Sequence, residues 1–157
     1  MLIAFFSWGG NTKGIAKKIQ KETGADLFEI ELVHPYSDDY DTVLDEAQRD
    51  QNKQARPEIK NHVEDMVQYD TVILGYPNWW YSCPMALLSF FDENDLSGKQ
   101  VYLFCSHGTG GLASSVKDIL AAIPDAKISD NVFDAYEEDT ASSKDKIVKW
   151  VKDTMDK

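Results

Sequence analysis

The sequence has little cysteine, histidine and basic charge. Two cysteines and three histidines occur in 157 residues, and acidic residues outnumber basic ones by 27 to 16. Cys83 and Cys105 show no C-x-x-C spacing and no second Cys/His cluster accompanies them, which disfavours a zinc site and leaves reduced thiols as the expected state. The formal net charge of -11 repels phosphate backbones and anionic lipid headgroups. We therefore expect no binding to nucleic acid or to a membrane.

Long apolar runs are also absent. No run approaches the roughly 20 residues of a membrane-spanning helix, and the first residues, M-L-I-A-F-F, lack the basic start of a signal peptide. A length of 157 residues, 43% of them hydrophobic, suits one domain with one hydrophobic core. We expect a single cytoplasmic domain over residues 1–157.

Short apolar runs mark the strands of a sheet. Residues 1–6, 71–74 and 101–105 are apolar without alternation, and Gly or Ser closely follows each run, which is typical of strands buried on both faces. Residues 26–32 alternate apolar and acidic side chains, as an edge strand with one wet face does. A last, faint strand is expected near residues 128–133.

Segments with helical spacing lie between and after these strands. They follow Thr12 and then cover residues 59–67, 86–91, 116–123 and 147–151. This alternation predicts an α/β fold, with a doubly wound, five-stranded parallel sheet and helices on both of its faces.

Residues 34–57 interrupt the alternation with a polar insertion. It contains Tyr36, Tyr40, six acidic residues between positions 38 and 50, and a proline at its end. The apolar positions from Val43 to Ala47 could form one edge of a short helix. An insertion of this length in a compact domain is usually functional or disordered.

A loop rich in glycine and hydroxyl residues follows the first strand. The chain reads S-W-G-G-N-T from Ser7 to Thr12 and then enters a helix, so main-chain N–H groups and two hydroxyls converge at a positive helix end. This predicts an anion site. Neither G-x-x-x-x-G-K-[ST] nor G-x-G-x-x-G is present, which disfavours a nucleoside triphosphate and a dinucleotide. A glycine-rich turn with a Thr or Asn cap is the structural alternative.

Aromatic residues follow the third strand. The segment G-Y-P-N-W-W-Y-S-C-P, residues 75–84, places Trp79 and Trp80 beyond the carboxyl end of a buried strand, where open α/β sheets bind ligands. Two consecutive tryptophans cannot both face the same interior, so we expect at least one to meet a flat ligand or a partner surface. The alternative is a hydrophobic lid over the core.

A second glycine-rich loop follows the fourth strand. It reads S-H-G-T-G-G from Ser106 to Gly111, and its glycines permit a close approach of the main chain to a ligand. His107 lies either beside that ligand or in solvent.

The three loops resemble those of the flavodoxin-like family, in particular its short-chain bacterial members, and the resemblance covers nearly the whole chain. The S-x-S-G-N-T phosphate loop of that family is matched by Ser7, Gly10, Asn11 and Thr12. Its G-x-P-x-W-W segment is matched by Gly75, Pro77, Trp79 and Trp80, and its second glycine-rich loop by Ser106, Gly108, Gly110 and Gly111. The insertion is also similar, with Pro35, Tyr36 and Tyr40 before R-P-E-I-K at residues 56–60.

The resemblance, and not the spacing, implies a strand order of 2-1-3-4-5 and FMN as the cofactor. The implied cofactor-binding residues are Ser7, Trp8, Gly9, Gly10, Asn11, Thr12, Pro77, Asn78, Trp79, Trp80, Ser106, His107, Gly108, Gly110 and Gly111. No residue is assigned a catalytic or metal-binding role. Two positions depart from the family pattern, because Gly9 stands where a hydroxyl residue is usual and His107 where a small hydroxyl residue is expected.

The function that the resemblance implies is electron transfer by bound FMN, whose potential the protein sets. Acidic residues oppose an anionic reduced flavin, and one charge at about 10 Å with an effective dielectric constant of about 20 contributes roughly 1.7 kcal/mol. The leading interpretation is a low-potential carrier that docks to basic patches on its reductase and acceptor proteins. The sequence assigns no oligomeric state.

Two other functions share this architecture. An FMN-dependent reductase that passes hydride from NAD(P)H to a quinone needs space above the ring, which Tyr36, Tyr40 and the two tryptophans could fill or could shape into a substrate slot. A receiver-type regulatory domain needs carboxylates at the ends of the first and third strands. Those ends read A-F-F-S-W and L-G-Y-P-N, which disfavours the regulatory domain.

Overall fold

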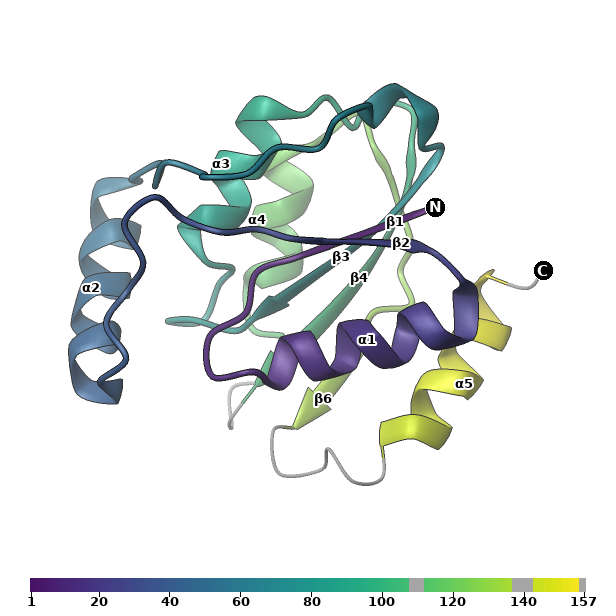
Figure 1. Ribbon diagram of the computed structural model, residues 1–157, viewed down its shortest axis with the longest axis horizontal. Helices are drawn as coiled ribbons and strands as arrows, with labels where there is room; N and C mark the ends of the chain where they lie inside the picture. The colour runs from purple at the N-terminus through teal and green to yellow at the C-terminus, as the bar shows by residue number, and fades with distance from the viewer. Residues whose placement is uncertain (108–111, 137–142, 156–157) are drawn as a thin grey trace.

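The computed structural model describes residues 1–107, 112–136 and 143–155, and it places helices on both faces of a parallel sheet (Figure 1). The strands are β1 (Leu2–Phe5), β2 (Asp26–Glu29), β3 (Thr71–Pro77), β4 (Gln100–His107), β5 (Lys127–Ile128) and β6 (Phe133–Tyr136). The α-helices are α1 (Asn11–Thr23), α2 (Tyr40–Lys53), α3 (Met85–Glu93), α4 (Ser115–Ala122) and α5 (Ser143–Met155), and a short 3-10 helix covers Met66–Gln68. The predicted α/β class is confirmed.

The strands of the sheet lie in the order β2-β1-β3-β4-β5, with β6 also paired to β4, and every pairing is parallel. The order 2-1-3-4-5 is therefore confirmed. The single strand expected near residues 128–133 is instead two short strands, β5 and β6, so the sheet has six strands and not five. Residues 129–132 separate them, because the N–H groups of Asn131 and Val132 bond within this polar turn instead of to β4.

Two hydrophobic clusters cover the two faces of the sheet. One includes side chains of α3 and α4, and the other includes side chains of α1 and α5. Every residue of β1 is buried, and β3 and β4 are buried over most of their length, as their unbroken apolar runs predicted. The clusters hold the inner strands in register and so determine where the loops after β1, β3 and β4 emerge.

The helix expected over residues 59–67 is wrong. Ile59 forms an antiparallel bridge with Leu32, and the Lys60 N–H donates to the Glu31 carbonyl. Only the 3-10 helix at Met66–Gln68 is helical there, and Val67 is 85% exposed. Ile59 therefore lies in an extended chain beside the sheet edge. β2 ends at Glu29, earlier than the expected 26–32, and Leu32 beyond it pairs with Ile59.

The insertion supplies a helix instead. Residues 40–53 form α2, which begins after Asp39, whose carboxylate accepts the Thr42 N–H. Val43 and Ala47 are its buried positions, so the expected apolar edge is confirmed. The helix stands beyond the end of the sheet toward which β3 points (Figure 1).

Across the described ranges 1–107, 112–136 and 143–155, no helix has both the length and the apolar character needed to cross a bilayer.

Candidate functional site

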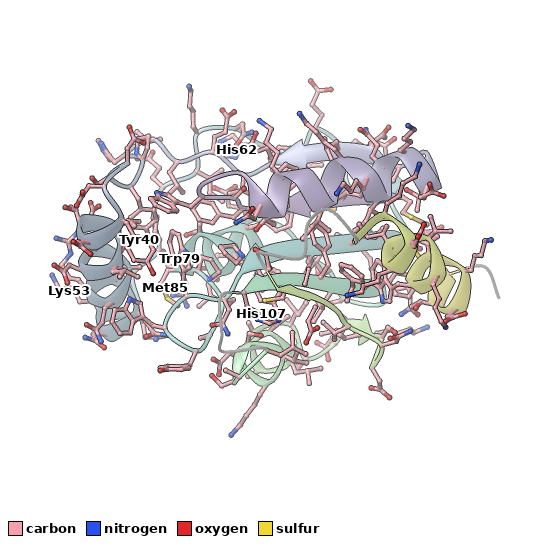
Figure 2. All side chains as sticks on the ribbon, turned by 90° about the horizontal axis from the view of Figure 1, so that it is seen from below. Tyr40, Lys53, His62, Trp79, Met85 and His107 are labelled. Atoms are coloured by element: carbon pink, nitrogen blue, oxygen red, sulfur yellow. The ribbon has the colours of Figure 1, made fainter. Side chains whose placement is uncertain are left out.

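The fold brings residues of the first and third predicted loops into contact at one edge of the sheet. The hydroxyl of Thr12, at the start of α1, lies 2.8 Å from the hydroxyl of Ser106, at the end of β4. The Asn78 N–H donates to the Ser106 carbonyl at 2.8 Å. Trp79 and His107 both lie at the end of the sheet that faces α2 (Figure 2). The loops after β1, β3 and β4 therefore share one site region.

The first loop contains two consecutive glycines in left-handed conformations. Gly9 has φ of 79° and Gly10 has φ of 95°, a region that side chains disfavour by about 1–2 kcal/mol. This explains why glycine, and not a hydroxyl residue, stands at position 9. A Cβ added at either glycine would meet no atom within 4 Å. The loop therefore leaves open space at the start of α1.

The start of α1 offers neutral donors. Gly10 is its N-cap and has no side chain to accept a first-turn N–H, so the N–H groups that precede that of Lys13 remain available to an anion. The Ser7 hydroxyl accepts the Lys13 N–H at 3.2 Å. The Lys13 ammonium pairs with the Glu29 carboxylate at 3.1 Å, and this contact draws its charge toward β2. Thr12 is 1% exposed, so its hydroxyl holds the first loop to β4.

The second loop makes a tight turn that its sequence does not indicate. Trp79 and Ser82 exchange both main-chain hydrogen bonds, at 3.0 and 3.1 Å. The two residues between them, Trp80 and Tyr81, have φ of 50° and 66°. Positive φ at both central residues is the pattern of a type I′ turn, which strongly prefers Asn-Gly or a similar pair. We refer to residues 79–82 as the tryptophan turn.

The two adjacent tryptophans contact different neighbours within this chain, and the expectation that one of them meets a ligand or a partner stays a prediction. The Trp79 ring lies 5.4 Å from Phe6 and 5.2 Å from Tyr36, nearly perpendicular to both, an arrangement that aromatic rings favour. The Trp80 indole N–H donates to the Leu44 carbonyl of α2 at 2.8 Å. Trp79 thus packs against the core and the insertion, while Trp80 faces the inserted helix.

The insertion also contacts the first loop. The Trp8 indole N–H donates to the Ser37 carbonyl at 2.9 Å, and its ring lies 6.2 Å from the ring of Tyr40.

Burial and a 2.6 Å hydrogen bond to Asp50 raise the pKa of Tyr36 far above its ordinary value. The sequence indicated the insertion and the loops but not the contacts between them. The indole N–H groups need acceptors when buried, and this need was the signal that could have predicted those contacts.

The third predicted loop is described only in part. Ser106 is buried, and the His107 side chain is 13% exposed with its Nε2 4.0 Å from the Asp134 carboxylate of β6. His107 is therefore mostly buried, and its place beside a ligand stays a prediction. Gly108, Gly110 and Gly111 lie outside the described residues.

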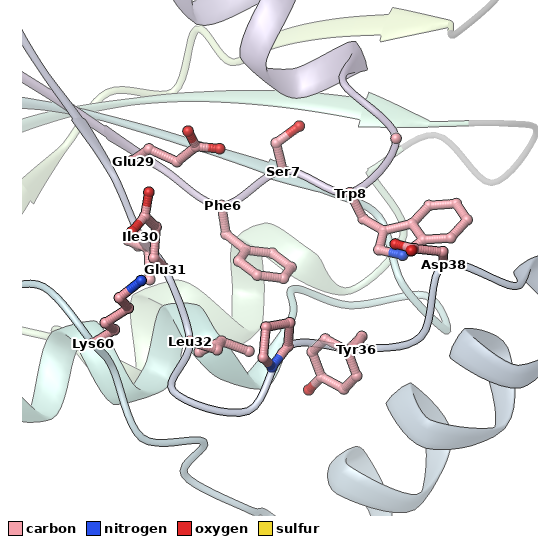
Figure 3. Close-up of a pocket in the computed structure, with 12 residues that line it drawn as sticks. Phe6, Ser7, Trp8, Glu29, Ile30, Glu31, Leu32, Tyr36, Asp38 and Lys60 are labelled. Carbon is pink, nitrogen blue, oxygen red and sulfur yellow. The ribbon is translucent and has the colours of Figure 1, made fainter.

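A cavity of about 540 Å³ borders the first loop (Figure 3). It lies between the end of β1 and the chain that follows β2, and it is lined by Phe6, Ser7, Trp8, Gly9, Glu29, Ile30, Glu31, Leu32, Pro35, Tyr36, Asp38 and Lys60. Three carboxylates and one ammonium line it, so its charge opposes an anion. The start of α1, with its main-chain N–H donors, suits an anion better than this cavity does. The cavity was not predicted, because its walls come from segments that lie far apart in the sequence.

The cysteines show no sign of reactivity. Cys83 and Cys105 are both buried and neither forms a disulfide, and burial raises the pKa of Cys83 to about 11. A neutral thiol is a poor nucleophile and a poor metal ligand. Among the residues that the structure describes, no group of three His, Cys, Asp or Glu side chains is arranged to hold a metal ion.

Comparison with known sequences gives a consistent family. A family model described as flavodoxin matches residues 1–154. Flavodoxin 1 of Escherichia coli (strain K12) is 29% identical over 127 residues, which cover 78% of this chain and 58% of the relative. A flavodoxin of Haemophilus influenzae is 31% identical over 99 residues, which cover 60% of this chain and 42% of the relative. The chain therefore spans less than two thirds of the length of these curated relatives.

Solved structures agree with the sequence comparison. A flavoprotein from Lactobacillus acidophilus in complex with FMN has a TM-score of 0.73 at 25% identity, with 92% of this chain and 95% of that chain covered. A Bacteroides uniformis protein has a TM-score of 0.85 at 22% identity, with 96% of each chain covered, and at this identity the likeness shows the fold alone. Because the family model matches nearly every residue, the chain belongs to the flavodoxin family.

Proposed function

We propose that the chain binds FMN at the carboxyl edge of the sheet and carries electrons between other proteins. The observation that carries this proposal is the open start of α1, where Gly9 and Gly10 leave space and the N-cap residue has no side chain. Such a helix end, with neutral donors around it, suits a phosphate group. The similarity to a flavoprotein that binds FMN supports the same ligand here.

The residues proposed to hold FMN come from all three loops. Ser7, Thr12 and the main-chain N–H groups of residues 8–11 would bind the phosphate, and the segment from Pro77 to Trp80 would lie beside the ring with the loop that begins at Ser106. Neutral donors dominate this set, since Lys13 is already paired with Glu29. When bound, FMN supplies the redox chemistry. The chain orients it and limits its contact with water.

The aromatic packing favours a carrier over a reductase. Tyr36 and Trp79 occupy the space between the insertion and the second loop, because their rings lie 5.2 Å apart and both contact Phe6. These paired rings, with the hydrogen bond from Trp80 to α2, fill space that a reductase would need for its substrates.

The charge of the chain suits protein partners with basic docking surfaces. A net charge of -11 attracts basic patches over several ångströms and speeds encounter at low salt. We propose a reductase and an acceptor protein as the partners, in the cytoplasm.

The absorption spectrum of the purified protein, followed through stepwise anaerobic reduction, tests the proposal. We expect a flavin spectrum that changes in two one-electron stages, with slow direct oxidation of NADH or NADPH. Absence of flavin binding by the apoprotein would refute the FMN site. Rapid oxidation of NADPH coupled to reduction of a quinone, in a single two-electron stage, would instead support a reductase.

A further inference from the structure

The tryptophan turn holds two large residues in a conformation that they disfavour. Trp80 and Tyr81 both have positive φ, and positive φ is uncommon for residues other than glycine, asparagine and aspartate. Such strained residues persist only where surrounding contacts over-determine them. The contacts that maintain this turn must therefore lie outside it.

One set of contacts comes from the inserted helix. The Gln51 side-chain amide of α2 donates to the Trp80 carbonyl at 3.2 Å. The Trp80 indole N–H returns a hydrogen bond to the Leu44 carbonyl at 2.8 Å. Leu44 and Gln51 lie seven residues apart, two turns along one face of α2, so the helix contacts both the main chain and the side chain of Trp80.

A second set comes from the start of α4. The Ser114 N–H and hydroxyl both lie within hydrogen-bond distance of the Tyr81 carbonyl, at 3.0 and 2.6 Å. The Ser82 hydroxyl donates to the Asp118 carboxylate, which also lies 3.1 Å from the Ser114 hydroxyl. The carbonyls of both strained residues are thus occupied, one by α2 and the other by α4.

We propose that the inserted helix α2 is a positioning element for the cofactor loop, and that Gln51 is its positioning residue. Gln51, with the Leu44 carbonyl on its own helix and Ser114 and Asp118 on α4, keeps the tryptophan turn in its left-handed form. The turn then presents one fixed surface to the ligand. This inference rests on the proposed function only for the identity of that ligand, because the clamp itself is a property of the chain.

The first test needs no ligand. Gln51→Met removes the donor but keeps the length and helix propensity of the side chain, and Gln48→Met makes the same change at an exposed position of α2. Hydrogen exchange of the Ser82 amide, which closes the turn, reports its opening. We expect Gln51→Met to speed this exchange about fivefold, the factor for one net hydrogen bond, and Gln48→Met to leave it unchanged.

The second test asks whether Gln51 acts by opposing strain. Tyr81→Gly places at the second central position the one residue that adopts positive φ without a Cβ penalty, and the Tyr81 side chain is 67% exposed. In that background we expect Gln51→Met to change Ser82 exchange less than twofold. The proposal would be overturned if Gln51→Met changed Ser82 exchange equally in the parent and in Tyr81→Gly. It would also be overturned if Gln48→Met and Gln51→Met changed this exchange equally in the parent.

The third measurement connects the clamp to the ligand. Titration of the apoproteins with FMN, followed by flavin fluorescence, is expected to show about fivefold weaker binding for Gln51→Met and recovery when Tyr81→Gly is added. Unchanged FMN affinity in a variant with faster Ser82 exchange would refute the positioning role. If the parent protein binds no FMN, the proposed function fails while the exchange experiments still decide whether the clamp exists.

Discussion

The loops after β1 and β3 reach left-handed conformations by different means. The first uses Gly9 and Gly10, which have no Cβ to strain, and an added Cβ would meet nothing within 4 Å. The tryptophan turn uses Trp80 and Tyr81, and two neighbouring helices bond to the carbonyls of these residues. The first loop is left-handed because its residues are glycines, and the tryptophan turn is left-handed because tertiary contacts hold it so.

The difference has a consequence for each loop. A glycine loop remains open, so space and main-chain donors are available to an anion. A turn of large residues brings aromatic surface to the site, but it depends on helices that lie far away in the sequence, at residues 40–53 and 115–122. Substitutions in α2 should therefore alter the conformation of the tryptophan turn more than that of the first loop.

The largest expected effect concerns the donors of the first loop. Thr12→Ala should weaken FMN binding by about 1–2 kcal/mol, because it removes the hydroxyl that we propose donates a hydrogen bond to the charged phosphate. Lys13→Ala should cost less, since the Lys13 ammonium is bonded to Glu29. Calorimetric titration with FMN measures both. Thr12→Ser, which keeps the hydroxyl, is the control, and a larger loss for Lys13→Ala than for Thr12→Ala would contradict the assignment.

The second effect isolates the glycine conformation. Gly10→Ala should lower the free energy of unfolding by about 1 kcal/mol, since alanine disfavours positive φ while space for its methyl group is open. Gly14→Ala, four residues further inside α1, should raise it by about 0.5–1 kcal/mol through helix propensity. Urea denaturation of the apoproteins compares them. Changes of the same sign would show that space, and not φ, decides at Gly10.

The third effect is the reverse change in the tryptophan turn. Tyr81→Gly should raise the free energy of unfolding by about 0.5 kcal/mol, because relief of the left-handed strain exceeds the added entropy of the unfolded chain. Tyr81→Ala removes the same exposed ring without relieving the strain, and it should not stabilise the protein. Thermal and urea unfolding of the pair distinguish them, and equal stability of the two variants would show that the turn is unstrained.

The smallest effect concerns the cap of α2 and its dependence on pH. The hydrogen bonds from Thr42 hold the pKa of Asp39 below its ordinary value of 3.8. A carboxyl group with a lowered folded-state pKa stabilises the fold above its unfolded pKa, and the contribution is lost as the pH falls through the folded value. Below about pH 4, the start of α2 should loosen.

Asp39→Asn provides the matched variant for this effect. The amide oxygen can still cap the helix, but it does not titrate. Urea unfolding between pH 5 and pH 3 should therefore show a shallower loss of stability in Asp39→Asn than in the parent. Parallel curves for the two proteins would mean that Asp39 contributes nothing to the acid sensitivity of α2.

The sequence was sufficient for the layers of the fold. Apolar runs without alternation identified the buried strands, and the glycine and aromatic loops that follow them indicated the edge at which we propose that FMN binds. The strand order came from the family resemblance and not from the spacing. These features depend on neighbouring residues or on a repeated pattern, so one sequence is enough to predict them.

Only the tertiary structure showed which contacts form between segments that are distant in the sequence. The spacing of residues 59–67 suits a helix, but pairing with Leu32 makes the chain extended, because covering the sheet edge satisfies its main-chain groups. No local signal marks Trp80 and Tyr81 as a left-handed turn. Its conformation depends on Gln51 and Ser114, at separations of 29 and 33 residues from the carbonyls they contact. Local propensity opposes that turn, and long-range hydrogen bonds, which a sequence does not display, overcome it.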